Sequence, residues 1–255
     1  MRKIFIVFVL LFLVGCVSNV PKMSGFTEKT YQGNDEFSLS GMEKNVKIGE
    51  KLRVYIDGDA KTGGLFAQKA VLEYPVAAEL ALKDTSPSIL YLNRPCYFSD
   101  DEKCQPVVWK EGRYNPEIID EMVFVLQNFV QKYHIPEIEL VGYDGGAAVA
   151  LLVASRLYNK KINVSKVITI AGILDTQHYA SLTGEDLHSA ALNPAREVYT
   201  LAKIPQLHIV GALDKKTPVS LVKVFKKKLG KATSFKVESY ESADHYNWAK
   251  FKINY

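Results

Sequence analysis

Two spacings of apolar residues alternate along the chain, and they predict strands and helices in turn. Short apolar or alternating runs, typical of strands, occupy residues 51–57, 88–93, 138–141, 164–171, 206–211 and 235–240. Apolar residues at helical spacing occupy 115–130, 147–157 and 221–229, and residues 248–253 are expected to form a closing turn or helix. Strands that alternate with helices predict an α/β fold with a doubly wound, mostly parallel sheet and helices on both faces.

Residues 174–205 fit this alternation poorly. One interpretation is a small lid over the edge of the sheet that carries the active site. The other is a long surface crossover with a short helix near Pro194 to Leu201. The sequence leaves both open.

The first residues have the three parts of a secretory signal: Met1-Arg2-Lys3, eleven apolar residues at 4–14, and then Gly15-Cys16. Eleven residues are too few to span a hydrocarbon layer of about 30 Å. Leu13 to Cys16 resembles a bacterial lipobox, which implies a lipid on Cys16 and an anchor in the bilayer. The alternative is an ordinary signal peptide cleaved near Gly15. Val17 is not an aspartate, so the resemblance implies the periplasmic face of the outer membrane.

Composition divides the chain into three parts. Residues 1–15 are the expected signal peptide, and residues 16–35, rich in Ser, Gly, Lys and Thr, are the expected flexible tether. Residues 36–255 are expected to form one α/β domain, because about 220 residues can bury a single large core.

The net charge argues against nucleic acid as a partner. It falls from +4 to +2 when Arg2 and Lys3 leave with the signal peptide. The run Lys226 to Lys228 is interpreted as the solvent-facing side of a helix. No residue pattern calls for a cofactor.

Cys96 and Cys104 remain as a pair if Cys16 carries lipid. Outside the cytoplasm an even pair suggests a disulfide. A metal site is the weaker alternative, because no histidine lies near either cysteine and two thiolates do not complete a tetrahedral shell.

Residues 142–146, Gly-Tyr-Asp-Gly-Gly, connect the strand at 138–141 to the helix at 147–157. Small residues on both sides of a central one permit the sharp strand-to-helix turn called a nucleophile elbow. The central residue here is Asp144, where a serine is usual.

Two further residues follow strands in the order that α/β-hydrolases use after the nucleophile. Asp214 comes after the strand at 206–211, and His245 lies in the loop after the last strand. His245 is the predicted proton carrier and Asp214 the acid that orients it. Asp244 is a less favoured acid, because its side chain is expected to point away from the imidazole.

Backbone N–H groups near Asp144 are candidates for an oxyanion hole. We expect one from Gly145 and one from the loop at 58–61, with Gly58 and Asp59 as its candidates. His208, on a predicted core strand, is expected to be structural rather than a ligand.

From Tyr55 to Trp248 the chain resembles bacterial lipoprotein-type α/β-hydrolases. The resemblance is carried by residues 55–59, 91–96, 140–146, 171–175, 191–194, 204–208 and 245–248. It implies the hydrolase fold, a Cys96 to Cys104 bridge, and the roles given to Asp214 and His245. It would place a serine where Asp144 stands, and it tends to place a glycine where Ala60 stands.

Three interpretations of Asp144 follow. A carboxylate that attacked an ester would form an anhydride, so serine-esterase chemistry is not expected. Attack on saturated carbon, as in dehalogenases and epoxide hydrolases, would give an enzyme ester that water activated by His245 hydrolyses. Their elbows usually place an aromatic residue where this chain has Gly145.

The second interpretation is a non-catalytic binding or scaffold lipoprotein with a static Asp144–His245 ion pair. The third is a hydrolase in which Asp144 activates water directly. All three leave the substrate open.

Overall fold

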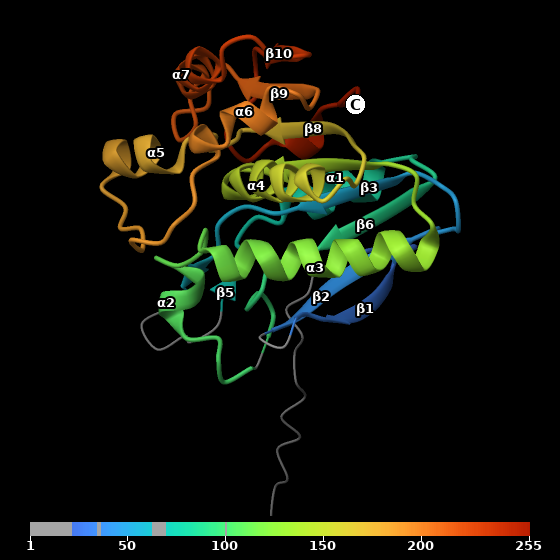
Figure 1. Cartoon of the computed structure of the whole chain (residues 1–255). Helices are drawn as coiled ribbons and strands as arrows, with labels where there is room; N and C mark the ends of the chain where they lie inside the picture. Colours follow the sequence, from blue (N-terminus) through green and yellow to red (C-terminus); the bar gives the residue numbers. More distant parts are fainter. Residues whose placement is uncertain (1–21, 35–36, 63–69, 100) are drawn as a thin grey trace, which may run out of the picture.

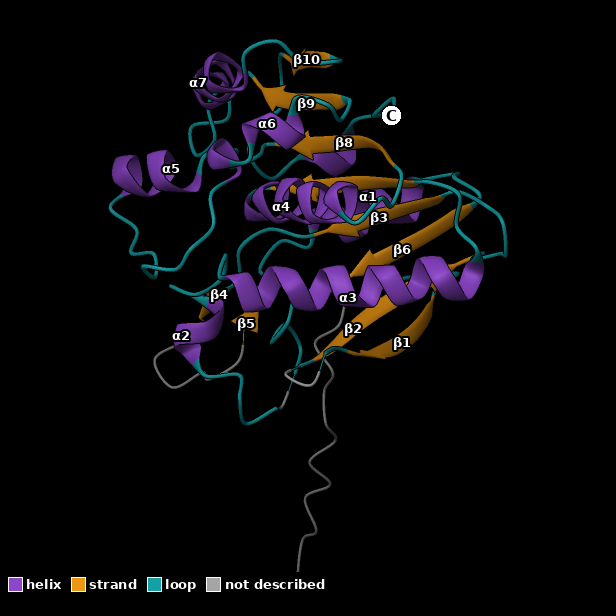
Figure 2. Cartoon of the chain, in the orientation of Figure 1, coloured by secondary structure: helices purple, strands orange, loops and turns teal. Residues whose placement is uncertain are grey.

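An eight-stranded sheet forms the centre of the molecule. The computed structural model describes residues 22–34, 37–62, 70–99 and 101–255. The sheet has the order β1-β2-β6-β3-β7-β8-β9-β10, and Figure 2 shows it running from β1 at the bottom to β10 at the top. Its strands are β1 Thr27–Gln32, β2 Ser38–Lys44, β3 Leu52–Ile56, β6 Ser88–Leu92, β7 Ile138–Tyr143, β8 Val164–Ile170, β9 Gln206–Gly211 and β10 Phe235–Tyr240. From β6 to β10 all neighbours are parallel, whereas β1 and β2 pair antiparallel. A small separate sheet pairs β4 (Lys61–Thr62) with β5 (Ala70–Val71).

Helices cover both faces of the sheet. They are α1 Val76–Lys83, α2 Pro106–Trp109, α3 Pro116–Tyr133, α4 Gly145–Asn159, α5 Thr176–Thr183, α6 Val198–Leu201 and α7 Val219–Leu229, with 3-10 turns η1 Pro194–Arg196 and η2 Trp248–Lys250. The core under α3, α4, α6 and α7 lies on one face, and the core shared by α1 and η2 lies on the other. Figure 1 shows α3 and α4 in front of the strands. The predicted doubly wound, mostly parallel sheet is therefore confirmed.

Strand β7 shows how the sequence builds these two cores. All six of its residues are buried. Leu140 belongs to the core under α3 and α4, and Val141 and Tyr143 belong to the core under α1. A strand buried on both faces needs apolar side chains at consecutive positions, and this requirement explains the continuous apolar run.

The folded part begins earlier than composition suggested. Residues 27–32, assigned to the tether, form β1, which pairs with β2 from Thr27–Glu43 to Gln32–Ser38. Five of its six residues are exposed, so the strand lacks the apolar alternation that would predict it. The expected signal peptide, Cys16 and the first part of the tether lie outside the described residues.

Residues 174–205 contain α5, η1 and α6, so the short helix expected near Pro194 to Leu201 is present. The segment packs on the connection between α2 and α3. The His188 N–H donates to Glu111 O at 2.8 Å, the Leu192 N–H donates to Tyr114 O at 2.8 Å, and Arg113 pairs with Glu185.

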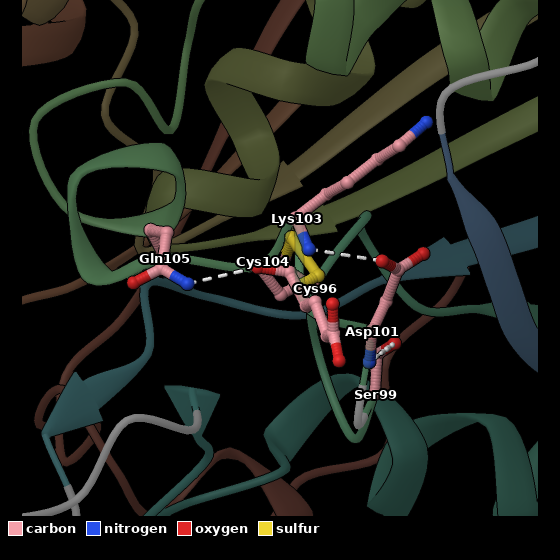
Figure 3. The surroundings of a disulfide bond; sticks show 7 residues. Cys96, Ser99, Asp101, Lys103, Cys104 and Gln105 are labelled. Atoms are coloured by element: carbon pink, nitrogen blue, oxygen red, sulfur yellow. Dashed lines mark hydrogen bonds between the residues drawn. A yellow bond between two sulfur atoms is a disulfide. The ribbon is translucent and has the colours of Figure 1, made fainter.

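Cys96 and Cys104 form a disulfide, and both are buried (Figure 3). The loop that they close follows β6 and carries Tyr97, with Arg94 just before it. Tyr97 OH accepts the Ala60 N–H at 2.9 Å, and Arg94 donates to Asp57 O. The bridge thus supports the segment after β3.

We expect the paired change Cys96→Ala and Cys104→Ala to lower the free energy of unfolding by about 2 to 3 kcal/mol, because a short closed loop no longer restricts the unfolded chain. Urea denaturation of residues 22–255 measures the change, with reduced wild type as the matched reference. An unfolding midpoint equal to that of the oxidised wild type would contradict this expectation.

Candidate functional site

Asp144 occupies a sharp turn between β7 and α4. Its backbone has φ 51° and ψ −122°, a conformation that non-glycine residues seldom adopt. A Cβ on Gly142 would lie 2.6 Å from Ala147 Cα, and one on Gly146 would meet Ile56 O. The small residues are therefore needed where α4 passes close to β3 and β7, as the nucleophile-elbow interpretation expects.

The two carboxylate oxygens of Asp144 have different partners. Oδ2 accepts the Asp59 N–H at 3.2 Å and Lys216 Nζ at 3.0 Å. Oδ1 is buried and has no hydrogen-bond partner among the described residues. It pairs with His245 Nε2 at 3.5 Å, and this nitrogen is likewise buried without a hydrogen bond among the described residues.

Asp214 holds the other side of His245. His245 Nδ1 and Asp214 Oδ2 are 2.9 Å apart, and the hydroxyl of Thr217 donates to the same oxygen at 2.7 Å. Asp214 Oδ1 accepts the N–H groups of Lys216 and Thr217 at 2.9 and 2.8 Å. The structure therefore brings Asp144, Asp214 and His245 together in the predicted order.

Asp244 makes different contacts. Its Oδ1 accepts the backbone N–H groups of Tyr246 and Asn247 at 2.8 and 2.9 Å. These bonds close the turn that carries His245. Asp214, not Asp244, is bonded to the imidazole.

Carboxylates and cationic groups meet in this cluster. Burial acts to raise the pKa of Asp144, but His245 and Lys216 outweigh it and hold the pKa well below 3.8. Burial likewise acts against the charge of His245, but Asp144 and Asp214 raise its pKa above 6.5. Despite its burial, Asp214 also has a lowered pKa because of His245. Two carboxylates thus face an ammonium and an imidazole that favours its protonated form.

Asp59 is fixed by cations from outside the sheet. Its carboxylate accepts Arg94 Nη2 at 2.8 Å, Arg113 Nε at 3.0 Å and Tyr114 OH at 2.7 Å. Arg94 is fully buried. These bonds point the Asp59 N–H towards Asp144.

The three predicted oxyanion residues contribute differently. Asp59 donates its N–H to Asp144. Gly58 leaves space, since a Cβ there would lie 2.9 Å from Asp144 Cβ and Oδ2. In the described part of the chain, no hydrogen bond joins the Gly145 N–H to the Asp144 carboxylate. A Cβ on Gly145 would overlap the Asp59 carboxylate, so this glycine permits the close approach of the two loops.

Sequence reasoning missed Lys216, Arg94 and Arg113. Lys216 follows Asp214 by two residues, and this proximity is the one signal that could have drawn attention to it. Arg94 and Arg113 are 35 and 54 residues from Asp59, and no local pattern joins them.

The cavity at the site is small. It has a volume of about 30 Å³, enough for one or two water molecules. Its lining includes Asp144, Lys216 and His245. The rings of Tyr74 and Tyr246, tilted by 41° with centroids 4.5 Å apart, contribute to its wall. A larger groove of about 570 Å³ lies between α6 and residues 229–233, and none of the site residues lines it.

His208 is part of the core. It is fully buried, with Nδ1 2.7 Å from Thr169 Oγ1 and Nε2 3.2 Å from Gln206 Oε1. Burial lowers its pKa to about 3, which keeps the ring neutral. Across the described ranges, no group of three or more His, Cys, Asp or Glu side chains is arranged to hold a metal ion.

Several solved structures resemble this one. Acylaminoacyl peptidase from Pyrococcus horikoshii matches with a TM-score of 0.64 and 15% identity over 90% of this chain. An esterase from Pyrococcus furiosus matches with a TM-score of 0.62 and 15% identity over 88% of it. Est1E from Butyrivibrio proteoclasticus matches with a TM-score of 0.59 and 14% identity over 89% of it. A scan of protein-family models and a search of curated proteins gave no match.

The matches establish a fold of the α/β-hydrolase type. The chain spans 39% of the peptidase, 84% of the esterase and 93% of Est1E. At these identities they establish the fold alone, and the chemistry has to be argued from the residues.

We expect the charged cluster to make stability depend on pH above 6.5. The folded-state pKa of His245 is raised, so its stabilising effect is complete below 6.5 and is lost as pH rises through that raised pKa. Urea unfolding of wild type should therefore show a loss of stability as the pH rises above 6.5, and this loss should be smaller in His245→Gln.

The exposed His188→Gln variant is the matched control, and it should follow wild type. Parallel pH profiles for wild type and His245→Gln would show that the imidazolium contributes nothing to folding. The carboxylates make stability depend on pH in the acid range. Because their pKa values are lowered in the folded state, the stabilisation by Asp144 and Asp214 is lost as pH falls below about 4.

Proposed function

We propose that this protein is a hydrolase in which Asp144 attacks a saturated carbon atom. The unequal bonding of its two oxygens is the observation that carries the proposal. Oδ2 accepts hydrogen bonds from the Asp59 N–H and Lys216, whereas Oδ1 accepts none among the described residues and lies 3.5 Å from His245 Nε2. A nucleophilic carboxylate needs one oxygen fixed and the other free to form a bond.

The first step forms an ester. Oδ1 bonds to an alkyl carbon, and the leaving group departs with the electron pair of the bond that breaks. If the leaving group is the oxygen of a strained ring, it takes up a proton and stays attached to the same alkyl group. Attack on a carbonyl would instead give an anhydride, so alkyl halides and epoxides are the substrate classes we propose.

The second step regenerates the carboxylate. Water attacks Asp144 Cγ and gives a proton to His245 Nε2, and the Cγ–Oδ1 bond then breaks. Oδ1 leaves in the alcohol product, which recovers the proton, and one oxygen from water stays on Asp144. Asp214 keeps the imidazole oriented through Nδ1, which is 2.9 Å from its Oδ2.

The charge of His245 fits this order of steps. In the free protein both carboxylates favour the imidazolium, which cannot accept a proton. Ester formation removes the negative charge beside Nε2, and the pKa of His245 then falls. The neutral imidazole can then accept a proton from the water that hydrolyses the ester.

A second candidate is a non-catalytic binding protein. As in the interpretation above, this protein would bind a partner or act as a scaffold without turning over a substrate. The cavity of about 30 Å³ favours it, because it is far below the 300 Å³ or more of pockets that hold a small molecule. In this role the four charges would be a static, self-compensating cluster. The two candidates differ in what they require of this cavity. Catalysis requires a side chain to move so that an alkyl halide can enter, and the non-catalytic role does not.

The test is to trap the ester. We expect His245→Gln, incubated with short alkyl halides and epoxides, to accumulate an adduct on the peptide that contains Asp144, because deacylation lacks its base. Wild type in H₂¹⁸O should place the label on Asp144 during a single turnover. Peptide mass spectrometry measures both.

Asp144→Asn should form no adduct, and Asp244→Asn should behave as wild type, since Asp244 only closes a turn. Absence of adduct and turnover over the whole panel would refute the nucleophile and favour the binding protein.

We also propose export and a lipid anchor on Cys16. The apolar run that ends at this cysteine supports the proposal, as does the Cys96–Cys104 bridge, a bond that persists in oxidising compartments. No helix in the described ranges is long and apolar enough to cross a bilayer. Two or more acyl chains would anchor the chain stably, on the periplasmic face of the outer membrane.

We expect Cys16→Ser to move the full chain, expressed in a bacterium with two membranes, from the detergent phase to the aqueous phase of a Triton X-114 partition. Metabolic labelling with palmitate should mark wild type alone. Equal partition of the two proteins would argue for a cleaved signal peptide without lipid.

A further inference from the structure

We infer that Lys216 is a catalytic residue: its ammonium supplies the second donor of the oxyanion hole, in the role expected of the Gly145 N–H. The inference deepens the proposed function, on which it rests. It concerns one oxygen, Asp144 Oδ2, and the charge that develops there. Nothing in the order nucleophile, acid, histidine requires a lysine.

Two donors converge on this oxygen from separate loops. Lys216 Nζ lies 3.0 Å from Oδ2, and the Asp59 N–H lies 3.2 Å from it. Lys216 comes from the loop after β9, and Asp59 comes from the loop after β3. Because β3, β7 and β9 belong to one parallel set, their carboxyl ends meet at the same edge of the sheet. Paired donors aimed at one oxygen are the arrangement that stabilises a developing oxyanion.

Asp214 positions this lysine as well as the histidine. Its Oδ2 bonds His245 Nδ1, and its Oδ1 accepts the backbone N–H of Lys216 at 2.9 Å. One carboxylate thus fixes both groups that face Asp144. The Lys216 side chain is 35% exposed and lines the cavity, so its flexible stem can follow an oxygen that moves.

The chemical consequence lies in the hydrolysis step. When water attacks Cγ of the Asp144 ester, the electron pair of the C=O bond moves onto Oδ2. The ammonium and the Asp59 N–H are already on that oxygen, so the negative charge forms without reorganisation. When the Cγ–Oδ1 bond breaks, the pair returns to the carbonyl and the contact remains.

The inference is tested in the Asp144→Ser background. Esterase activity there does not depend on an attack of Asp144 on saturated carbon. Oxyanion donors also serve a serine that attacks an ester, so we expect Asp144→Ser to hydrolyse p-nitrophenyl acetate. Adding Lys216→Met should lower kcat by about 10² to 10³ with little change in KM. Lys216→Arg, which keeps the cation, should retain more of kcat than Lys216→Met.

Lys215→Met, in the same background, is the matched control, because the exposed neighbouring lysine has no contact with Asp144 among the described residues. Equal kcat for Lys215→Met and Lys216→Met would overturn the inference. A folded Asp144→Ser protein without esterase activity would also overturn it, because both donors are then present and ineffective.

A second measurement keeps Asp144 and is therefore informative even if the Asp144→Ser variants do not fold. In otherwise wild-type protein, carboxyl ¹³C NMR should show a higher pKa for Asp144 in Lys216→Met than in Lys215→Met, and equal values would overturn the contact. Adduct trapping in His245→Gln, in which Lys216 is unchanged, tests the aspartate nucleophile separately. The role of Lys216 can therefore be refuted while Asp144 remains the proposed nucleophile. Equally, the nucleophile can be refuted while the contact between Lys216 and Asp144 is confirmed.

Discussion

The pairing of Asp59 with Arg94 and Arg113 is the interaction on which the rest of the site depends. Arg94 donates to one carboxylate oxygen and Arg113 to the other, and both guanidinium groups are almost removed from solvent. A buried charge is tolerated only when it is paired and hydrogen-bonded. The pairing fixes the backbone of Asp59, whose N–H donates to Asp144 Oδ2, so two arginines that do not contact Asp144 help to position its carboxylate.

An aspartate at the elbow changes the electrostatics that the fold must balance. A serine would bring no charge, but Asp144 adds a buried carboxylate near Asp59 and Asp214. The two arginines balance Asp59, and Lys216 with His245 balances the other two acids. The compensation extends through three loops, those that follow β3, β7 and β9.

The sequence predicted what local patterns encode. The strands flanking the site, the glycine turn at 142–146 and the positions of Asp214 and His245 after strands all follow from apolar spacing and small residues. Strand β1 was missed because an edge strand exposed to water needs no apolar face. Strand β2, which lies between β1 and β6, was missed although it buries Leu39 and Met42, because polar residues and Gly41 interrupt its apolar pattern. Lys216 and the arginine pair were missed for a different reason: charge partners that meet through the tertiary fold leave no periodic trace in the chain.

The disulfide between Cys96 and Cys104 touches none of the three triad residues, yet it closes the loop that carries Tyr97, next to Arg94. These two side chains hold the segment from Gly58 to Ala60. In a chain whose two thiols are still reduced, the segment from Gly58 to Ala60 is held by a less restrained loop. A covalent bond that contacts neither Asp144 nor His245 thus restrains the backbone that faces them.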